Sequence, residues 1–563
     1  MVNLIKKVKE EIIKTVLSGF ESACEKGLID KVEACPVEIE NTKEKKFGDF
    51  ATNFALKMSK VAGKNPRELA GILLEEIGES SLIEKAEVAG PGFINFFLNK
   101  SWLYNNVMYI LKAKENFGKV TVGNGKKVMV EFISANPTGP MHIGNARGGA
   151  LGDSLANLLN FAGYSASKEF YVNDYGNQIE KFAVSLNARF IQKVFGEDAI
   201  EFPEDAYHGQ DIIDNVCEFI EKYGCEKYKD MDETERKKHL VEFALNKNIE
   251  KLKADTGLYG ITYDRWFFES ELHKSGAVKK VIEELSERGY TYEKDEATWF
   301  KATEFGSEKD VVLIRGNNLP TYFAADIAYH KNKIERGYET LIDIWGADHH
   351  GHVARMQGAL TALGLGGDKL TVILMQLVRL MKNGEVYKVS KRSGKAVTLT
   401  DLLEDIGTDA ARFFFNLRQA NTHFDFDMDL AVSKSNDNPV FYVQYAHARI
   451  SSILSILSEE GVDVSDEAYD YLTLLKDDEE LDLIEKISWF PQEVEDAALT
   501  LDPSKLTKYA VSVASSFHTF YNAKRVKVED TKLMKARIML IKAVKITLKN
   551  LMGILGITAP DRM

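Results

Sequence analysis

The chain is poor in cysteine and has no long apolar run. Its 563 residues include four cysteines, and none of them forms a C-x-x-C pair, so the sequence offers no zinc framework and predicts reduced thiols. No stretch of about 18 apolar residues occurs, so no membrane span is expected. Residues 1–20 alternate charged and apolar residues without the apolar segment of a signal peptide. These absences predict a cytoplasmic protein with no membrane contact and no dedicated metal site.

An excess of basic charge is also lacking. Lysine and arginine number 72 against 85 aspartates and glutamates, and the formal net charge is −13. Composition alone therefore favours a metabolic enzyme over a nucleic-acid-binding protein. RNA is not excluded, because binding depends on a local basic surface rather than on the total charge.

The order of strand and helix signals predicts three regions. Residues 1–112 have an α+β pattern, and residues 436–563 have an all-α pattern. Residues 116–435 alternate strands and helices, which indicates an α/β domain with a Rossmann-like parallel sheet, interrupted by a charged helical insertion at about 183–303. The expected strands are Lys127–Phe132, Ala166–Val172, Thr340–Trp345 and Thr371–Val378. Ligands of such sheets bind beyond the carboxyl ends of the strands.

The stretch EFISANPTGPMHIGNARGGALGD, Glu131 to Asp153, carries the strongest functional pattern. It follows one expected strand and leads into apolar residues with helical spacing. The prolines and glycines between them predict a tight turn, so that free N–H groups and the helix dipole face one point and bind an anion. His142 and Asn145 lie at that point. The alternative is that both side chains are buried and only cap the turn.

The second functional pattern is the basic stretch KVSKRSGKAVTL, in which Lys388 and Lys391 lie on either side of Ser390. Two lysines on a glycine-containing loop suit a mobile clamp for a polyphosphate. Taken alone, such a pentamer is more often a solvated loop.

Three histidines follow an expected strand in WGADHHGH, residues 345–352. They invite a zinc interpretation. However, the adjacent His349 and His350 point apart in a helix or a strand, and no carboxylate–histidine pattern surrounds them. We therefore expect no metal site here.

The stretches SANPTGPMHIGN, YVQYAHARI and KVSKRSGK together resemble the arginyl-tRNA synthetases of bacterial type, in that family's order and spacing. HIGN at 142–145 is similar to the HIGH signature of class I aminoacyl-tRNA synthetases, with asparagine for the last histidine. KVSKR at 388–392 is similar to their KMSKS loop. The resemblance implies ATP-dependent activation of L-arginine to arginyl-adenylate. It also implies transfer to the 3′-terminal adenosine of tRNA(Arg), with release of AMP and pyrophosphate.

The resemblance assigns an ATP site, with Mg²⁺ entering together with ATP. The helix start and the lysine loop would contact the phosphates, and an acid after a strand would bind the ribose hydroxyls, with His352 nearby. These residues are His142, Gly144, Asn145, Asp348, His349, Lys388, Ser390 and Lys391. Four of them, His142, Asn145, Lys388 and Lys391, would assist catalysis by stabilising phosphate charge.

The resemblance also assigns an arginine site. Glu131 and Asn136 would hold the α-amino end, while Glu269, Tyr322 and Asp326 would hold the guanidinium group. Carboxylates match the planar donors of a guanidinium group, and residues four apart share one helix face. The alternative is that Glu269 and Asp326 are surface charges.

For tRNA, the resemblance assigns the first region to the tRNA elbow and the last region to the anticodon. Tyr442 and Tyr445 can stack on bases, and Lys542 and Lys545 lie on a basic helical face that can follow phosphates. The alternatives are a core role for the tyrosines, a merely solvated basic face, and a first region that docks without touching RNA. The family also implies a monomer.

Two other functions are weighed. One is a related enzyme of the same H-x-G-[HN] superfamily, such as a synthetase for another amino acid or pantothenate synthetase; Tyr322, Asp326 and the YVQYAHARI stretch oppose it. The other is a catalytically inactive tRNA-binding paralogue, which the presence of His142, Lys388 and Lys391 opposes.

Overall fold

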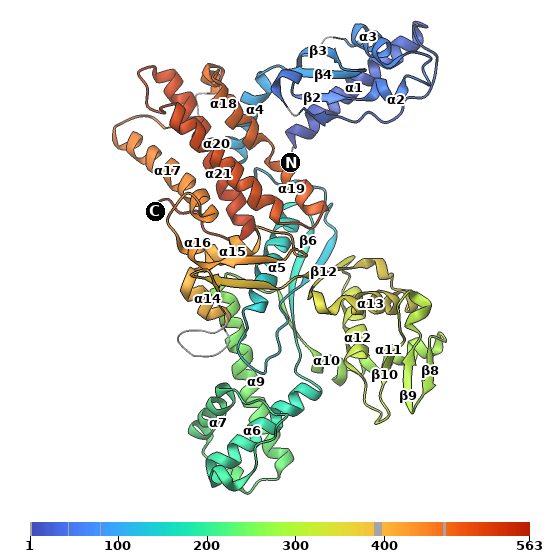
Figure 1. Cartoon of the computed structure of the whole chain (residues 1–563), viewed down its shortest axis with the longest axis vertical. Helices are drawn as coiled ribbons and strands as arrows, with labels where there is room; N and C mark the ends of the chain where they lie inside the picture. Colours follow the sequence, from blue (N-terminus) through green and yellow to red (C-terminus); the bar gives the residue numbers. More distant parts are fainter. Residues whose placement is uncertain (1–2, 43, 79, 388–396, 465–468) are drawn as a thin grey trace.

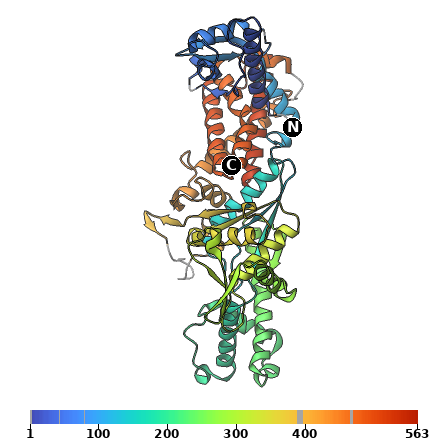
Figure 2. The same cartoon turned by 90° about the vertical axis from the view of Figure 1, so that its right-hand side faces the viewer.

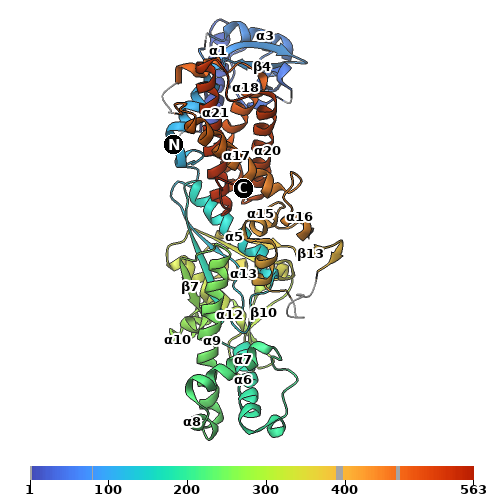
Figure 3. The ribbon, with the colours of Figure 1, turned by 90° about the vertical axis from the view of Figure 1, so that its left-hand side faces the viewer.

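The computed structural model describes residues 3–42, 44–78, 80–387, 397–464 and 469–563. The molecule is elongated (Figures 1, 2 and 3): the N-terminal region and the C-terminal helices lie toward one end, a parallel sheet lies in the middle, and α6 (Asn177–Phe195) and α7 (Gln210–Tyr223) form the other end. The predicted fold class, an α/β catalytic region with an α+β region before it and an all-α region after it, is confirmed. Within the described ranges, no helix is long and apolar enough to cross a membrane.

The central sheet has five parallel strands in the order β12-β11-β5-β6-β7. The first strand in sequence, β5, lies in the middle. The chain passes through α5 (Gly144–Phe161) to β6 on one side, while β11 pairs on the other. The strand order therefore reverses between β5 and β11, which is where ligands bind in such sheets. The strands are β5 (Lys127–Glu131), β6 (Ser165–Val172), β7 (Arg265–Phe268), β11 (Thr340–Gly346) and β12 (Leu370–Met375).

The last expected strand, 371–378, is two strands in the structure. β12 ends at Met375, and β13 (Val378–Lys382) begins a separate sheet of order β14-β13-β15. Only one polar residue, Gln376, interrupts the apolar run at this break, so periodicity alone does not reveal it. The remaining elements here are β14 (Glu385–Val386), α14 (Leu399–Ile406), α15 (Thr408–Phe415), β15 (Phe424–Asp427) and α16 (Met428–Val432).

The interval 183–303, treated above as one insertion, contains a strand of the central sheet. β7 pairs in parallel with β6, so this interval leaves the sheet, returns to it and leaves again. β7 is only four residues long and is flanked by charged helical segments, which conceals it in the sequence. The helices before β7 also include α8 (Glu226–Lys229) and α9 (Glu233–Leu258). After it come α10 (Glu269–Lys274), α11 (Ala277–Glu287), a three-stranded sheet of β8 (Thr291–Lys294), β9 (Ala297–Phe300) and β10 (Val311–Ile314), α12 (Tyr322–Glu335) and α13 (His350–Ala362).

The N-terminal region packs helices on an antiparallel sheet of order β1-β2-β4-β3. Helix α1 buries Ile5, Ile12 and Val16 at helical spacing, which forms its core face. Its elements are α1 (Leu4–Glu25), β1 (Glu40–Asn41), β2 (Phe50–Thr52), α2 (Phe54–Met58), α3 (Pro66–Glu76), β3 (Ile83–Ala89), β4 (Phe93–Leu98) and α4 (Ser101–Ala113).

The C-terminal region is a helical bundle around α21. This helix buries Ile538, Ile541, Val544 and Leu548 at helical spacing, which forms its core face. The helices are α17 (Pro439–Glu459), α18 (Asp478–Ser488), α19 (Phe490–Leu499), α20 (Ser504–Ala523) and α21 (Thr531–Leu555). All four cysteines lie in described ranges and are free.

Candidate active site

The backbone turns sharply where β5 ends. Ile133 and Ser134 have φ angles of 68° and 43°, in the left-handed region that costs a non-glycine residue about 1 kcal/mol or more. The Ser134 hydroxyl donates to Glu131 Oε1 at 2.9 Å and accepts from the Tyr171 N–H at 3.2 Å. These two bonds hold the strained turn and fix the carboxylate at the strand end.

The first turn of α5 presents the HIGN tetrapeptide to solvent. Gly144 begins the helix, His142 is exposed and Asn145 is half-buried. In the described part of the chain, no side chain caps this helix start. The alternative of a buried histidine and asparagine capping the turn is therefore wrong. The Asn145 and Ala146 N–H groups donate to the His142 and Ile143 carbonyls at 3.0 and 2.9 Å, so the positive end of the helix dipole and these two side chains are what this helix start offers to an anion.

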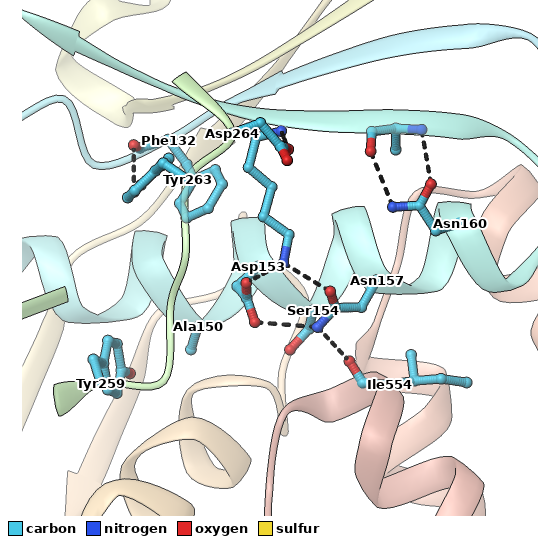
Figure 4. A network of polar contacts seen from close by, with 12 residues as sticks. Phe132, Ala150, Asp153, Ser154, Asn157, Asn160, Tyr259, Tyr263, Asp264 and Ile554 are labelled. Carbon is cyan, nitrogen blue, oxygen red and sulfur yellow. Dashed lines mark hydrogen bonds and ion pairs between the residues drawn. The ribbon is translucent and has the colours of Figure 1, made fainter. Parts of the chain in front are cut away.

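Helix α5 is fastened along its second half (Figure 4). Asp153 Oδ1 lies 2.5 Å from the Lys168 ammonium group of β6. On the opposite side, Asn157 donates to the Ile554 carbonyl at 3.3 Å. Ser154 also donates, to the Leu555 carbonyl at 3.2 Å. Both carbonyl groups belong to the last turn of α21, so the helix that starts at the candidate phosphate site is tied to the C-terminal bundle.

Helices α10 and α12 lie in contact, and both carry carboxylates of the expected arginine site. Asp326 projects from the helix that begins at Tyr322, whose side chain is 65% exposed. Glu269 begins α10 and is only 7% exposed. Burial, together with the negative charges of Asp326 and Asp174, raises the pKa of Glu269 to about 7. Glu269 Oε1 lies 3.3 Å from His273 Nε2, and no lysine or arginine pair is found for Glu269 among the described residues. A buried carboxylate in such a place suits a cationic ligand.

The other end of the expected arginine site lies at β5. Glu131 is buried, and its Oε2 lies 2.6 Å from the Lys333 ammonium group. Asn136 is exposed on the loop that follows, and this loop is held by a 2.8 Å hydrogen bond from Asn248 to the Pro137 carbonyl. Motif reasoning did not identify Lys333, because a lysine among other polar helix residues carries no signal of burial.

The histidines after β11 do not gather as a metal site. His349 and Asp348 are both exposed, with His349 Nε2 3.8 Å from Asp348 Oδ2. His352 was expected near the ribose, but its Nε2 lies 3.1 Å from Asp326 Oδ2 on the arginine side. Within the described ranges, no group of three or more histidine, cysteine or acidic residues is placed to hold a metal ion.

Three expected residues of the ATP site, Lys388, Ser390 and Lys391, lie outside the described residues. The chain is described again from Val397, whose carbonyl accepts from the Ile143 N–H at 3.2 Å. The first described residue after the lysine stretch is therefore bonded directly to the HIGN segment.

The four residues expected to contact tRNA lie on α17 and α21. Tyr442 and Tyr445 are half-buried, and their rings lie 4.6 and 5.9 Å from the ring of His518. Lys542 donates to the Val464 carbonyl at 2.9 Å, and Lys545 pairs with Asp561 at 2.9 Å.

Three family descriptions match successive parts of the chain: arginyl tRNA synthetase N terminal domain over residues 3–98, tRNA synthetases class I (R), catalytic domain over 106–431, and DALR anticodon binding domain over 443–563. An arginine–tRNA ligase of Caldanaerobacter subterraneus subsp. tengcongensis is 56% identical, and one of Ruminiclostridium cellulolyticum is 52% identical, each over 100% of both chains. The solved structure of Thermus thermophilus arginyl-tRNA synthetase has a TM-score of 0.74 at 21% identity and covers 98% of this chain and 100% of that one; this likeness concerns the fold.

Proposed function

This chain belongs to the arginyl-tRNA synthetase family, and from that premise we propose how its residues ligate arginine to tRNA. It is an aminoacyl-tRNA ligase that uses arginine, ATP and tRNA. In the reaction proposed, the arginine carboxylate attacks the α-phosphorus of ATP and pyrophosphate leaves. The 2′-hydroxyl of the terminal tRNA adenosine then attacks the acyl carbonyl, and AMP leaves. Neither step needs a nucleophile from the enzyme, so the protein acts by positioning and by stabilising charge.

The guanidinium group of arginine is assigned to the side chains at the starts of α10 and α12. Asp326 and Glu269 supply carboxylates, and the exposed ring of Tyr322 covers the group. The observation that carries this assignment is the placement of the buried Glu269 carboxylate near those of Asp326 and Asp174, whose negative charges add to burial in raising its pKa. At the other end, Glu131 and Asn136 would hold the α-amino group.

ATP is assigned to the mouth of the turn after β5. His142, Gly144 and Asn145 would donate to the phosphates at the helix start, and Asp348 with His349 would bind the ribose. Lys388, Ser390 and Lys391 would close on the β- and γ-phosphates. Mg²⁺ is treated as part of the nucleotide substrate.

The domain roles follow the same proposal. Residues 1–112 are assigned to the tRNA elbow, 116–435 to catalysis and 436–563 to the anticodon. Tyr442, Tyr445, Lys542 and Lys545 are assigned to tRNA contacts. We propose that the enzyme is a cytoplasmic monomer. Its four free cysteines fit a reducing compartment.

The test is arginine-dependent exchange between ATP and pyrophosphate, measured with and without tRNA(Arg). Exchange that requires arginine, and that lysine or methionine does not support, is the expected result. Exchange without tRNA would keep the ligase and discard the family's coupling of tRNA to activation. Folded protein with no exchange under either condition would instead favour the inactive paralogue.

A further inference from the structure

Helix α12 carries a fully buried lysine behind the proposed arginine site. The Lys333 side chain is 0% exposed, and its Nζ lies 2.6 Å from Glu131 Oε2 and 2.9 Å from Asp343 Oδ1. Glu131 and Asp343 are register partners on β5 and β11, the two strands between which the strand order reverses. An ammonium group in such a place is stable only when paired. Nothing in the reaction described above uses it.

A histidine connects this ion pair to the guanidinium end of the site. His330 Nε2 lies 2.7 Å from Asp343 Oδ2, and its Nδ1 lies 2.7 Å from the backbone carbonyl oxygen of Asp326. Burial alone would raise the pKa of Asp343, but the charges of Lys333 and His330 outweigh it and hold that pKa at about 2. His330 therefore bridges the buried Asp343 carboxylate and the backbone of Asp326.

We propose that Lys333 is a positioning residue for the α-amino group of arginine: it holds one oxygen of Glu131 and so presents the other to the substrate ammonium group. The presented oxygen is the one that Ser134 binds at the strained turn. This inference rests on the proposed role of Glu131 in the arginine site.

The same contacts set the distance between the two ends of the site. Asp326, His330 and Lys333 share the rigid helix α12, and Lys333 fastens that helix to the end of β5. Glu131 and Asp326 are therefore held at a separation that the helix determines. A substrate that has an α-amino group and a guanidinium group at that separation can pair with both carboxylates. By fixing this separation, Lys333 would contribute to the specificity for arginine.

The charge of Lys333 also acts on Glu131. Burial raises the pKa of Glu131, and the Lys333 ammonium group opposes that rise. Without the lysine, Glu131 would face the carboxylate of Asp343 with no cation between them. It would then take up a proton and lose its attraction for the substrate ammonium group.

The experiment compares two ligands in Lys333→Met. Arginine carries the α-amino group, and δ-guanidinovalerate carries the same guanidinium and carboxylate groups without it. We expect the KM for arginine to rise about 10- to 100-fold, while the inhibition constant of δ-guanidinovalerate and the KM for ATP stay within about twofold. An equal loss for both ligands, or an unchanged KM for arginine, would overturn the proposal.

A matched control is Lys331→Met on the same helix. Lys331 is partly buried and pairs with Glu284 of α11 rather than with Glu131 or Asp343, so its loss should change neither ligand's binding selectively. If Lys333→Met does not fold, the double variant Lys333→Met/Asp343→Asn removes the uncompensated acid, and the same loss specific to arginine is expected.

The variant Glu131→Gln distinguishes the proposed role of Glu131 from the proposed role of Lys333. If Glu131→Gln leaves the KM for arginine unchanged, the proposed role of Glu131 fails, and the inference fails with it. If Glu131→Gln raises that KM but neither Lys333 variant does, only the inference about Lys333 fails.

Discussion

His352 Nε2 lies 3.1 Å from Asp326 Oδ2, and this contact joins α13 to α12 next to the proposed guanidinium site. The His352 ring also packs edge-on against Phe323, with centroids 5.3 Å apart. The histidine is thus held by its neighbours and orients the carboxylate proposed to bind the guanidinium group. Its place in the histidine-rich stretch after β11 had suggested the ribose instead.

Replacing His352 by alanine should weaken arginine binding. Asp326 would lose the hydrogen bond that orients it, so the KM for arginine should rise about 3- to 10-fold with the KM for ATP unchanged. Steady-state aminoacylation measures both constants. His350→Ala, at an exposed neighbouring position, is the control and should change neither. A rise in the KM for ATP alone would return His352 to the ribose side.

Asp326→Asn should have a larger effect. The amide keeps the shape of the side chain but loses the charge that matches a guanidinium group, so the KM for arginine should rise about 10- to 100-fold. The measurement is pyrophosphate exchange over a range of arginine concentrations, with thermal unfolding to check the fold. Near-normal arginine affinity in a folded variant would show that Asp326 is not a ligand.

Arginine binding should weaken as the pH falls through about 7. Glu269 has its pKa raised to about 7, so it is ionised above that pH and accepts a proton below it. A neutral carboxyl group no longer attracts the guanidinium group. The expected result is a KM for arginine that rises at low pH in the native enzyme. Glu269→Gln should have a high KM that does not follow this titration.

The same group predicts an opposite effect on stability. Because the folded pKa of Glu269 lies above the unfolded value of about 4.5, the folded state holds the proton more tightly than the unfolded state. Ionised Glu269 therefore costs stability at high pH, and this cost disappears as the pH falls below both pKa values. Without arginine, Glu269→Gln should raise Tm at pH 8 and show a smaller difference at pH 5. An equal shift at both pH values would contradict the assignment.

Gly152→Ala should destabilise the packing of α5 on β5. A Cβ at this position would lie 2.2 Å from Phe132 Cγ, which is too close unless the helix or the strand moves. Such overpacking typically costs about 1–3 kcal/mol, so Tm should fall by several degrees. Gly553→Ala in α21 is the control, because its added Cβ meets nothing within 4 Å. A helical alanine there should be neutral or slightly stabilising.

The double variant Lys542→Ala/Lys545→Ala should weaken tRNA binding without changing arginine activation. Each lysine that contacts a phosphate contributes to the dependence of affinity on salt, so the KM for tRNA should rise and vary less steeply with salt concentration. Filter binding at several salt concentrations measures both effects. An unchanged salt dependence would show that these lysines do not contact tRNA phosphates.

The sequence predicted the elements that a local pattern encodes. The order of regions, the parallel strands and the exposed helix start at Gly144 all follow from periodicity and turn residues. It did not predict β7, because a four-residue strand between charged helices has no periodicity to read. It also did not predict the burial of Lys333 or the contact between His352 and Asp326. Burial of a lysine depends on Glu131 and Asp343, which lie elsewhere in the sequence and meet it only in the folded sheet.

The attachment of α5 to the last turn of α21 makes this helix a strut between the C-terminal bundle and the candidate phosphate site. The contacts at Ser154 and Asn157 lie about 15 to 20 Å from Gly144 at 1.5 Å per residue. The start of the helix is held as well, because the Tyr259 hydroxyl donates to the Ala146 carbonyl at 3.0 Å and the Ile143 N–H donates to the Val397 carbonyl at 3.2 Å. The C-terminal bundle therefore helps to fix the positions of His142 and Asn145, although none of its residues is assigned to the chemistry.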